Sequence, residues 1–136
     1  MAQSTGRIVV SAMNKAFRSA VSLKKQNMMK AIEIIIIPVS DQERAKEYYL
    51  KLGFKVVNQA PADHGETWLQ MGLPDDSTTI ALMSFHGIIM ETTNIAKSIK
   101  ELNEEGIEVG AIDHKPWGKF AWLKDPDGNG LCLHEK

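Results

Sequence analysis

The sequence is poor in cysteine and contains no long hydrophobic run. Its single cysteine excludes an intramolecular disulfide, so packing must hold the fold, as suits a reducing compartment. The longest apolar run, residues 34–39, is interrupted by Pro38 and is far too short to cross a bilayer. No apolar segment of signal-peptide length lies near the N-terminus. We therefore expect a cytoplasmic protein without a membrane partner, and its 136 residues suffice for one domain with a real core.

Acidic residues are absent from the first 30 positions, which carry a net charge of +6, whereas the remaining chain carries −7. Within this basic arm, Val10, Met13 and Phe17 recur at helical spacing, which predicts an amphipathic helix within residues 9–26. Such an arm can bind nucleic acid or membrane, direct transport to an organelle, pack on a neighbouring subunit, or be an upstream extension. The rest of the chain lacks a basic face or an aromatic stacking motif, so we do not expect nucleic acid as a partner.

After residue 30 the pattern of apolar residues changes to that of a mixed α/β body. Residues 32–37 are a nearly continuous β-branched run, typical of a buried strand. Ser40 stands three residues before Glu43, the spacing of a capping box, and Gly53 ends the helix that this box predicts. Further strands are predicted at residues 54–57, 66–71 and 78–84.

The second half repeats this order of elements. A strand is predicted at residues 87–91, followed by a helix that Thr93 or Asn94 caps and Gly106 ends. Three more strands are predicted at residues 107–112, 119–124 and 131–134. The repetition indicates two βαβββ modules, about residues 30–85 and 86–136, after an arm of residues 1–29. We expect an α+β fold in which the modules form a curved mixed sheet around a cavity for a small ligand.

Three segments resemble the vicinal oxygen chelate superfamily of glyoxalases, bleomycin-resistance proteins and extradiol dioxygenases. They are residues 38–54 (PVSDQERAKEYYLKLGF), residues 116–118 (PWG) and residues 125–129 (DPDGN). The resemblance covers about residues 30–136 and is to single-chain, two-module members. It implies a homodimer whose cavities are built from both modules of one chain or are shared between chains.

The resemblance also implies where metal-using members would bind a divalent ion. Counted from the matching motifs, the four ligand positions fall on Ile34, Ala81, Gly87 and Cys132. None of these supplies a hard oxygen or imidazole donor. Glu33 and His86 stand next to two of these positions, but strand alternation turns neighbours to the opposite face. We therefore expect no metal cofactor.

Other donors leave alternatives open. Cys132, His134 and Glu91 can share a face and bind zinc or a soft metal. The interpretation that we favour is that Cys132 is an apolar filler, His134 lies near the rim, and Glu91 neighbours a helix terminus. A Cys132 nucleophile with His134 as its base would lack an oxyanion-hole signature. His86, Glu91 and His134 as shifted ligands would instead indicate a metal-dependent lyase, isomerase or dioxygenase of the same superfamily.

Strand alternation predicts a cavity lined by aromatic and apolar side chains with few polar groups. The predicted ligand-binding residues are Ile34, Ile36, Trp68, Gln70, Met83, Glu91, Trp117, Phe120, Trp122, Cys132 and His134. Among them Gln70, Glu91 and His134 would orient the ligand, and Trp117 would lie on a loop that can close. Alternatively, Trp68 and Trp122 fill the core.

This lining favours one hypothesis of function over two others. The favoured one is metal-free binding or sequestration of a small aromatic or amphipathic molecule, as in bleomycin-resistance proteins. The second is the metal-dependent enzyme with shifted ligands. The third is a regulatory or partner-binding module in which the basic arm docks to another chain or to nucleic acid.

Overall fold

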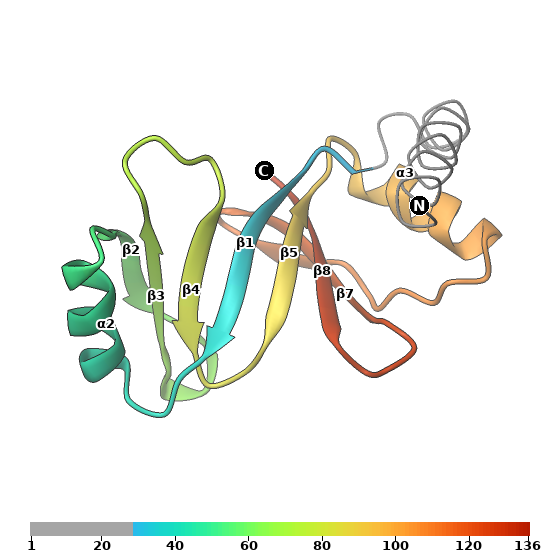
Figure 1. The fold of residues 1–136 in the computed structure, drawn as a ribbon. Helices are drawn as coiled ribbons and strands as arrows, with labels where there is room; N and C mark the ends of the chain where they lie inside the picture. The colour runs from blue at the N-terminus through green and yellow to red at the C-terminus, as the bar shows by residue number, and fades with distance from the viewer. Residues whose placement is uncertain (1–28) are drawn as a thin grey trace, which may run out of the picture.

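The computed structural model describes residues 29–136, which form one curved mixed sheet with helices at both ends (Figure 1). The strands are β1 (Ala31–Pro38), β2 (Lys55–Pro61), β3 (Thr67–Gly72), β4 (Thr79–Met83), β5 (Gly87–Glu91), β6 (Asp113–Lys115), β7 (Gly118–Lys124) and β8 (Gly130–Glu135). The helices are α2 (Gln42–Lys51) and α3 (Ile95–Glu104), and η1 (Asp63–Gly65) is a 3₁₀ turn. The predicted helix within residues 9–26 lies outside the described residues.

The sheet order is β2-β3-β4-β1-β5-β8-β7-β6 and shows the twofold repetition directly. β1 pairs with β4 in parallel and β5 pairs with β8 in parallel, while an antiparallel β1–β5 pair joins the modules. Helix α2 packs against β4 on the module 1 half of the sheet, and α3 packs against β7 and β8 on the module 2 half (Figure 1). The predicted α+β fold of two βαβββ modules in one curved sheet is confirmed. No helix among residues 29–136 is long and apolar enough to span a membrane.

The helix boundaries depend on local capping chemistry. The predicted Ser40 cap is wrong: Asp41 is the N-cap of α2, and its carboxylate accepts a hydrogen bond from the Arg44 amide at 3.2 Å. Asp41 has extended backbone angles, which direct its side chain at the third amide of the helix. Asn94 caps α3 in the same way. Gly53 and Gly106 have φ of 103° and 82°, the left-handed conformation that ends a helix at low cost.

Residues 107–112, predicted as a strand, are not one. This segment is tied to β7 by a hydrogen bond from the Gly110 amide to the Trp122 carbonyl, and ladder pairing begins only at β6. Val109 and Ile112 pack against the apolar cluster beneath α3. The apolar spacing of the segment therefore reflects contact with the helix layer rather than membership of the sheet.

Alternation along the strands separates three apolar clusters. Leu69, Met71 and Leu82 face α2, and Ile95, Leu102, Ala121 and Leu133 form the cluster under α3. The opposite face of the sheet, called the inner face below, holds the third cluster: Ile34, Ile36, Ala81, Met83, Ile89 and Cys132. Because strands from both modules contribute to it, the inner face is where the two halves of the chain form one surface.

Candidate functional site: the inner face of the sheet

The centre of the inner face is an apolar floor. Ile36, Ala81 and Cys132 have no exposed surface, and the partly buried rings of Trp68 and Phe120 pack against them. Ile34, Ile36, Met83 and Cys132, all predicted to bind ligand, thus lie together in one cluster. A ligand on this face would first meet the rings that cover the floor.

A chain of neutral polar groups crosses the module 1 side of the inner face. The Trp68 indole Nε1 donates to Gln70 Oε1 at 3.0 Å, and Gln70 Nε2 donates to Thr79 Oγ1 at 2.8 Å. Register pairs Gln70 with Ala81 of the floor, which places this neutral chain on the inner face. The two hydrogen bonds hold the Trp68 ring and use both ends of the Gln70 amide.

Two titratable side chains, Glu33 and His134, lie in contact on the same face and are called the charged pair below. His134 Nδ1 is 2.9 Å and 3.0 Å from the two carboxylate oxygens of Glu33, and its Nε2 is 3.3 Å from the Trp117 carbonyl. The imidazole stacks on Phe120 with ring centroids 4.2 Å apart and planes 5° from parallel. The two side chains are only 9% and 15% exposed. His134, which one interpretation of the sequence placed near the rim, is thus a largely buried side chain.

A β-bulge explains why Glu33 reaches His134. Ile32 pairs with Met90 and Ile34 with Ile89, so Glu33 is an extra residue against consecutive positions of β5. A bulged residue escapes strict alternation, because the extra residue kinks the strand and redirects side chains. The expectation that Glu33 faces away is therefore wrong. The available sequence signal was a lone carboxylate inside a run of isoleucines.

The environment of His134 stabilises its charged form. Burial, the largest single effect, lowers the pKa of His134, and the charge of Lys136 lowers it further. The hydrogen bond and charge of Glu33, together with the Trp117 carbonyl, outweigh both, so the net pKa lies above the ordinary value. The net effect therefore favours the protonated form of His134 over the neutral form.

Cys132 has the opposite electrostatic environment. Burial raises the pKa of its thiol to about 12, with the Glu33 charge adding to the increase. Its Sγ lies 3.5 Å from the Leu133 carbonyl. A thiol that stays protonated at neutral pH is a poor nucleophile, so the structure favours Cys132 as an apolar filler.

Accessible aromatic rings extend the inner face beyond the floor. Trp122, 41% exposed, lies over Gly87, where a Cβ atom would stand 3.2 Å from the indole. Phe85, 39% exposed, contacts Trp122 edge-on with centroids 6.2 Å apart. Trp122 therefore does not fill the core, and Phe85 is an aromatic residue that strand alternation missed because it follows the end of β4. Trp117 lies at the β6–β7 turn and is 63% exposed.

Glu91 is paired with His134 in the β5–β8 register, but its carboxylate is engaged elsewhere. It lies 3.7 Å from Lys30 Nζ and 3.5 Å from Lys136 Nζ. These ion pairs leave Glu91 at the margin of the inner face, beside the Glu33–His134 pair.

The residues present do not fit a hard divalent ion. Ile34, Ala81 and Cys132 do converge in one cluster, and a Cβ on Gly87 would stand 3.4 Å from Ile36, so the four positions lie close together. Their side chains nevertheless offer only a neutral thiol. Within residues 29–136, no three or more His, Cys, Asp or Glu side chains are grouped so that they could hold a metal ion.

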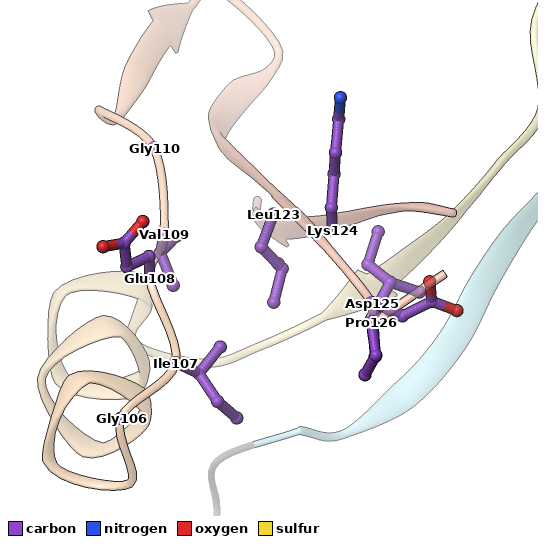
Figure 2. Close-up of a pocket in the computed structure, with 10 residues that line it drawn as sticks. Gly106, Ile107, Glu108, Val109, Gly110, Leu123, Lys124, Asp125 and Pro126 are labelled. Carbon is purple, nitrogen blue, oxygen red and sulfur yellow. The ribbon is translucent and has the colours of Figure 1, made fainter. Parts of the chain in front are cut away.

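A groove lies away from the inner face, between the α3–β6 segment and the β7–β8 turn (Figure 2). It has a volume of about 820 Å³, and Ile107, Val109, Leu123, Pro126 and Leu131 contribute its apolar lining. Asp125 at its edge accepts hydrogen bonds from the Asp127 and Asn129 amides and from Asn129 Nδ2. The Asn129 contacts lower the pKa of Asp125, whose carboxylate is thus committed to the turn before β8. This groove lacks a convergent polar group and is the weaker candidate.

Two βαβββ modules joined in one curved sheet around a shared inner face define a vicinal-oxygen-chelate type of protein. The family model described as "Glyoxalase/Bleomycin resistance protein/Dioxygenase superfamily" matches residues 31–133, and the chain belongs to this superfamily. No curated protein matches the chain.

The chain is also similar to several solved structures. Methylmalonyl-CoA epimerase from Mycobacterium tuberculosis is 15% identical with a TM-score of 0.72, covering 81% of this chain and 90% of that one. TnmS3, an antibiotic binding protein from Streptomyces sp. CB03234, is 31% identical with a TM-score of 0.38, covering 79% and 96%. A glyoxalase/bleomycin resistance protein from the same organism is 33% identical with a TM-score of 0.36, covering 75% and 97%. The likeness to the epimerase shows the fold alone.

Proposed function

We propose that this chain binds or sequesters a small aromatic or amphipathic molecule on the inner face. The observation that supports this most is the accessible Trp122–Phe85 surface, which adjoins an apolar floor and a buried charged pair. Aromatic walls with a few placed polar groups are typical of small-molecule sites. TnmS3 is an antibiotic binding protein, but the proposal for this chain rests on its own inner face.

The spacing of Phe120 and Trp122 along β7 suits a planar ligand. Phe120 and Trp122 pair with His134 and Cys132 across the β7–β8 ladder, so both rings share the inner face. Residues two apart on a strand are separated by roughly 7 Å, about the span of two fused aromatic rings. A two-ring ligand lying on Trp122 would therefore reach Phe120 and the imidazole stacked on it.

Three further properties belong to this proposal. Binding requires no metal, because the converging positions Ile34, Ala81, Gly87 and Cys132 lack hard donors; elemental analysis with metal titration tests this. The protein is a homodimer, which light scattering of the purified chain tests. It is cytoplasmic, as its single cysteine suggests, and fractionation of the source cells tests the location.

The test is a titration of the full chain with 2-naphthoate, followed by tryptophan fluorescence and by the ¹H–¹⁵N NMR signals. We expect saturable binding with the largest NMR shifts at Phe120, Trp122 and their neighbours. Trp122→Ala should weaken it, whereas Tyr48→Ala, which removes a ring that is 60% exposed on α2, should leave affinity unchanged. Non-saturable binding, or shifts confined to the groove residues Ile107 and Leu123, would contradict the proposal.

A further inference from the structure

We propose that the basic N-terminal arm docks on the outer face of its own chain, in the groove between the α3–β6 segment and the β7–β8 turn. The outer face is the side of the sheet that carries α2 and α3. The docked part is the amphipathic helix that the sequence predicts within residues 9–26. This surface lies opposite to the inner face, so the inference is independent of ligand binding there.

The groove offers an apolar surface that suits a helix. Ile107, Val109, Leu123 and Leu131 line it (Figure 2). Ile107 is 37% exposed, and Val109 and Leu123 also pack against the apolar cluster under α3. An amphipathic helix binds such a groove with apolar side chains that recur every three or four positions. The lack of a convergent polar group, which makes the groove a weak small-molecule site, does not matter for a helix.

A strip of aliphatic side chains continues the groove across the outer face. Leu131 pairs with Ile88 in the β5–β8 register, and Ile88 pairs with Ile35 across β1 and β5. Because Ile34 and Ile36 belong to the inner face, alternation places Ile35 on the outer face. There Ile35 is 37% exposed although it stands on a central strand. The apolar surface thus extends beyond the groove and is longer than a small ligand needs.

The described chain begins beside this surface. Met29 packs against the cluster under α3, to which Val109 and Leu123 of the groove also pack. The start of the described chain lies next to α3 (Figure 1). Only residues 27 and 28 separate Met29 from the end of the predicted helix, and this connection spans at most about 11 Å. The short connection keeps the arm near the α3 side of its own chain.

The lengths fit an arm that runs antiparallel to α3. The arm joins the body just before α3 begins, because the Lys30 amide donates to the Glu91 carbonyl at 2.8 Å. The groove begins with Gly106, at the other end of α3. The 10 residues of α3 span about 15 Å, whereas a helix over residues 9–26 is about 27 Å long. Such a helix passes along α3 and places its first half over the groove, with the apolar side chains Val10, Met13 and Phe17.

Four carboxylates gather at the end of α3 and the start of the groove. Glu101, Glu104 and Glu105 stand three and four positions apart and share one side of the helix, and Glu108 lines the groove. Like charges near the negative end of the helix dipole destabilise one another. The ion pairs among residues 29–136 involve other acids. Glu101 Oε2 is buried without a hydrogen-bond partner in that part of the chain, so a cationic donor is expected beside it.

The arm has the complementary charge. Residues 1–30 contain six basic residues and no acid. Arg7, Arg18 and Lys25 are about three and two helical turns apart, so they form a row along one flank of the predicted helix. Long basic side chains can cover apolar surface with their stems while their charged ends reach carboxylates. Charge and the short connection together assign the arm of the same chain, rather than a second copy, as the occupant of the groove.

The test locates the arm by paramagnetic relaxation in the full chain. Ser11→Cys carries a nitroxide on the side of the predicted helix opposite to Met13. Cys132 is buried and the pKa of its thiol is raised to about 12, so it does not react with the label. We expect strong broadening of the amide NMR signals of Val109 and Leu123, and little broadening of Trp68 on β3. Reduction of the nitroxide should restore the signals.

Two matched pairs of substitutions in the labelled chain separate docking from general effects of charge. Phe17→Asp places a charge on the apolar side of the arm and should lower the docking equilibrium constant about tenfold or more. Ser22→Asp places the same charge on the polar side and should change it less than about twofold. Ile107→Asp in the groove should act like Phe17→Asp, whereas Leu50→Asp, at an exposed position of α2, should not.

A mixed sample identifies which chain the arm occupies. It contains ¹⁵N-labelled wild-type chain and unlabelled chain that carries the nitroxide. Broadening of the wild-type groove signals would mean that the arm docks on a second copy, and it would overturn docking within one chain. The proposal is also overturned if the groove signals of the labelled chain do not broaden, if Trp68 broadens most, or if Phe17→Asp and Ser22→Asp have equal effects. No ligand enters these measurements, so their outcome is separate from that of the proposed function.

Discussion

The inner face carries two polar clusters that differ in charge and in how they are assembled. Trp68, Gln70 and Thr79 form a neutral chain between neighbouring strands, with its hydrogen-bonded residues two and nine positions apart. Glu33 and His134 are 101 positions apart, come from different modules, and are joined by a contact of 2.9 Å between the carboxylate and Nδ1. The neutral chain positions an aromatic ring, whereas the charged pair holds a donor in place. Substitutions in the neutral chain should change stability through a lost hydrogen bond alone. Substitutions in the charged pair should change stability through both packing and pH.

The largest effect should come from Gly118→Ala, which presses on His134 of the charged pair and on the backbone of β8 beside it. A Cβ at this position would stand 2.5 Å from His134 Nε2 and 2.6 Å from the Glu135 carbonyl, and the residue has a φ of 139°. Backbone strain and the collision together should lower the free energy of unfolding by about 3 kcal/mol. Urea denaturation measures the loss, and NMR of the His134 ring should show that its contact with Glu33 changes.

Gly65→Ala is the matched control for this substitution. Gly65 also has a positive φ, 74°, but a Cβ there would meet nothing within 4 Å. Gly65→Ala should lower the free energy of unfolding by about 1 kcal/mol, because only the left-handed backbone conformation is unfavourable for alanine. Equal losses at the two glycines would show that the close approach of Gly118 to His134 does not matter.

Glu33→Gln should give a smaller effect that depends on pH. Glu33 raises the pKa of His134 in the folded chain, so its stabilisation is complete below the unfolded pKa, about 6.5, and is lost as pH rises through the raised folded value. We expect the variant to be about 1–2 kcal/mol less stable than wild type near pH 6, because it must bury an imidazolium without its partner. The difference should shrink at higher pH in parallel urea titrations.

Charged groups other than Glu33 also affect the pKa of His134. Lys136 opposes the effect of Glu33 on the pKa of His134, and Glu91 lies beside the pair in ion pairs with Lys30 and Lys136. Lys136→Met should therefore move the pH dependence in the opposite direction to Glu33→Gln. A gap between wild type and Glu33→Gln that does not vary with pH would argue against a charged His134.

The same contrast explains which parts of the structure could be predicted from sequence. Some sequence signals act locally: glycines that end helices, helix caps and β-branched runs. These local signals were sufficient to predict the two βαβββ modules. Alternation also correctly placed Gln70 with Trp68, and Phe120 with Trp122, because β3 and β7 are regular where these residues stand. Residues 107–112 were misassigned because apolar contact with α3 leaves the same spacing as a strand.

The charged pair could not be predicted for a physical reason. A bulge in β1 has no required residue type, so the run of isoleucines looks the same with or without it. A prediction from strict alternation therefore placed Glu33 on the face opposite to His134. His134 was placed on the correct strand face, but its burial depends on the Trp117 turn and on Phe120, which come from elsewhere in the chain. Contacts of this kind are set by tertiary packing.

The smallest effect should come from Gln70→Met, which breaks the neutral chain and sharpens the comparison. Trp68 Nε1 then loses its acceptor, while Thr79 Oγ1 keeps a contact of 3.5 Å to the Glu33 carbonyl. The free energy of unfolding should fall by about 1 kcal/mol, with no change between pH 6 and 9 because no titrating group is removed. In the double variant with Glu33→Gln, the two losses should add to within about 0.5 kcal/mol, since the side chains of the two clusters do not share a hydrogen bond. A larger coupling, or a pH-dependent loss in Gln70→Met alone, would mean that the inner face holds one polar network rather than two.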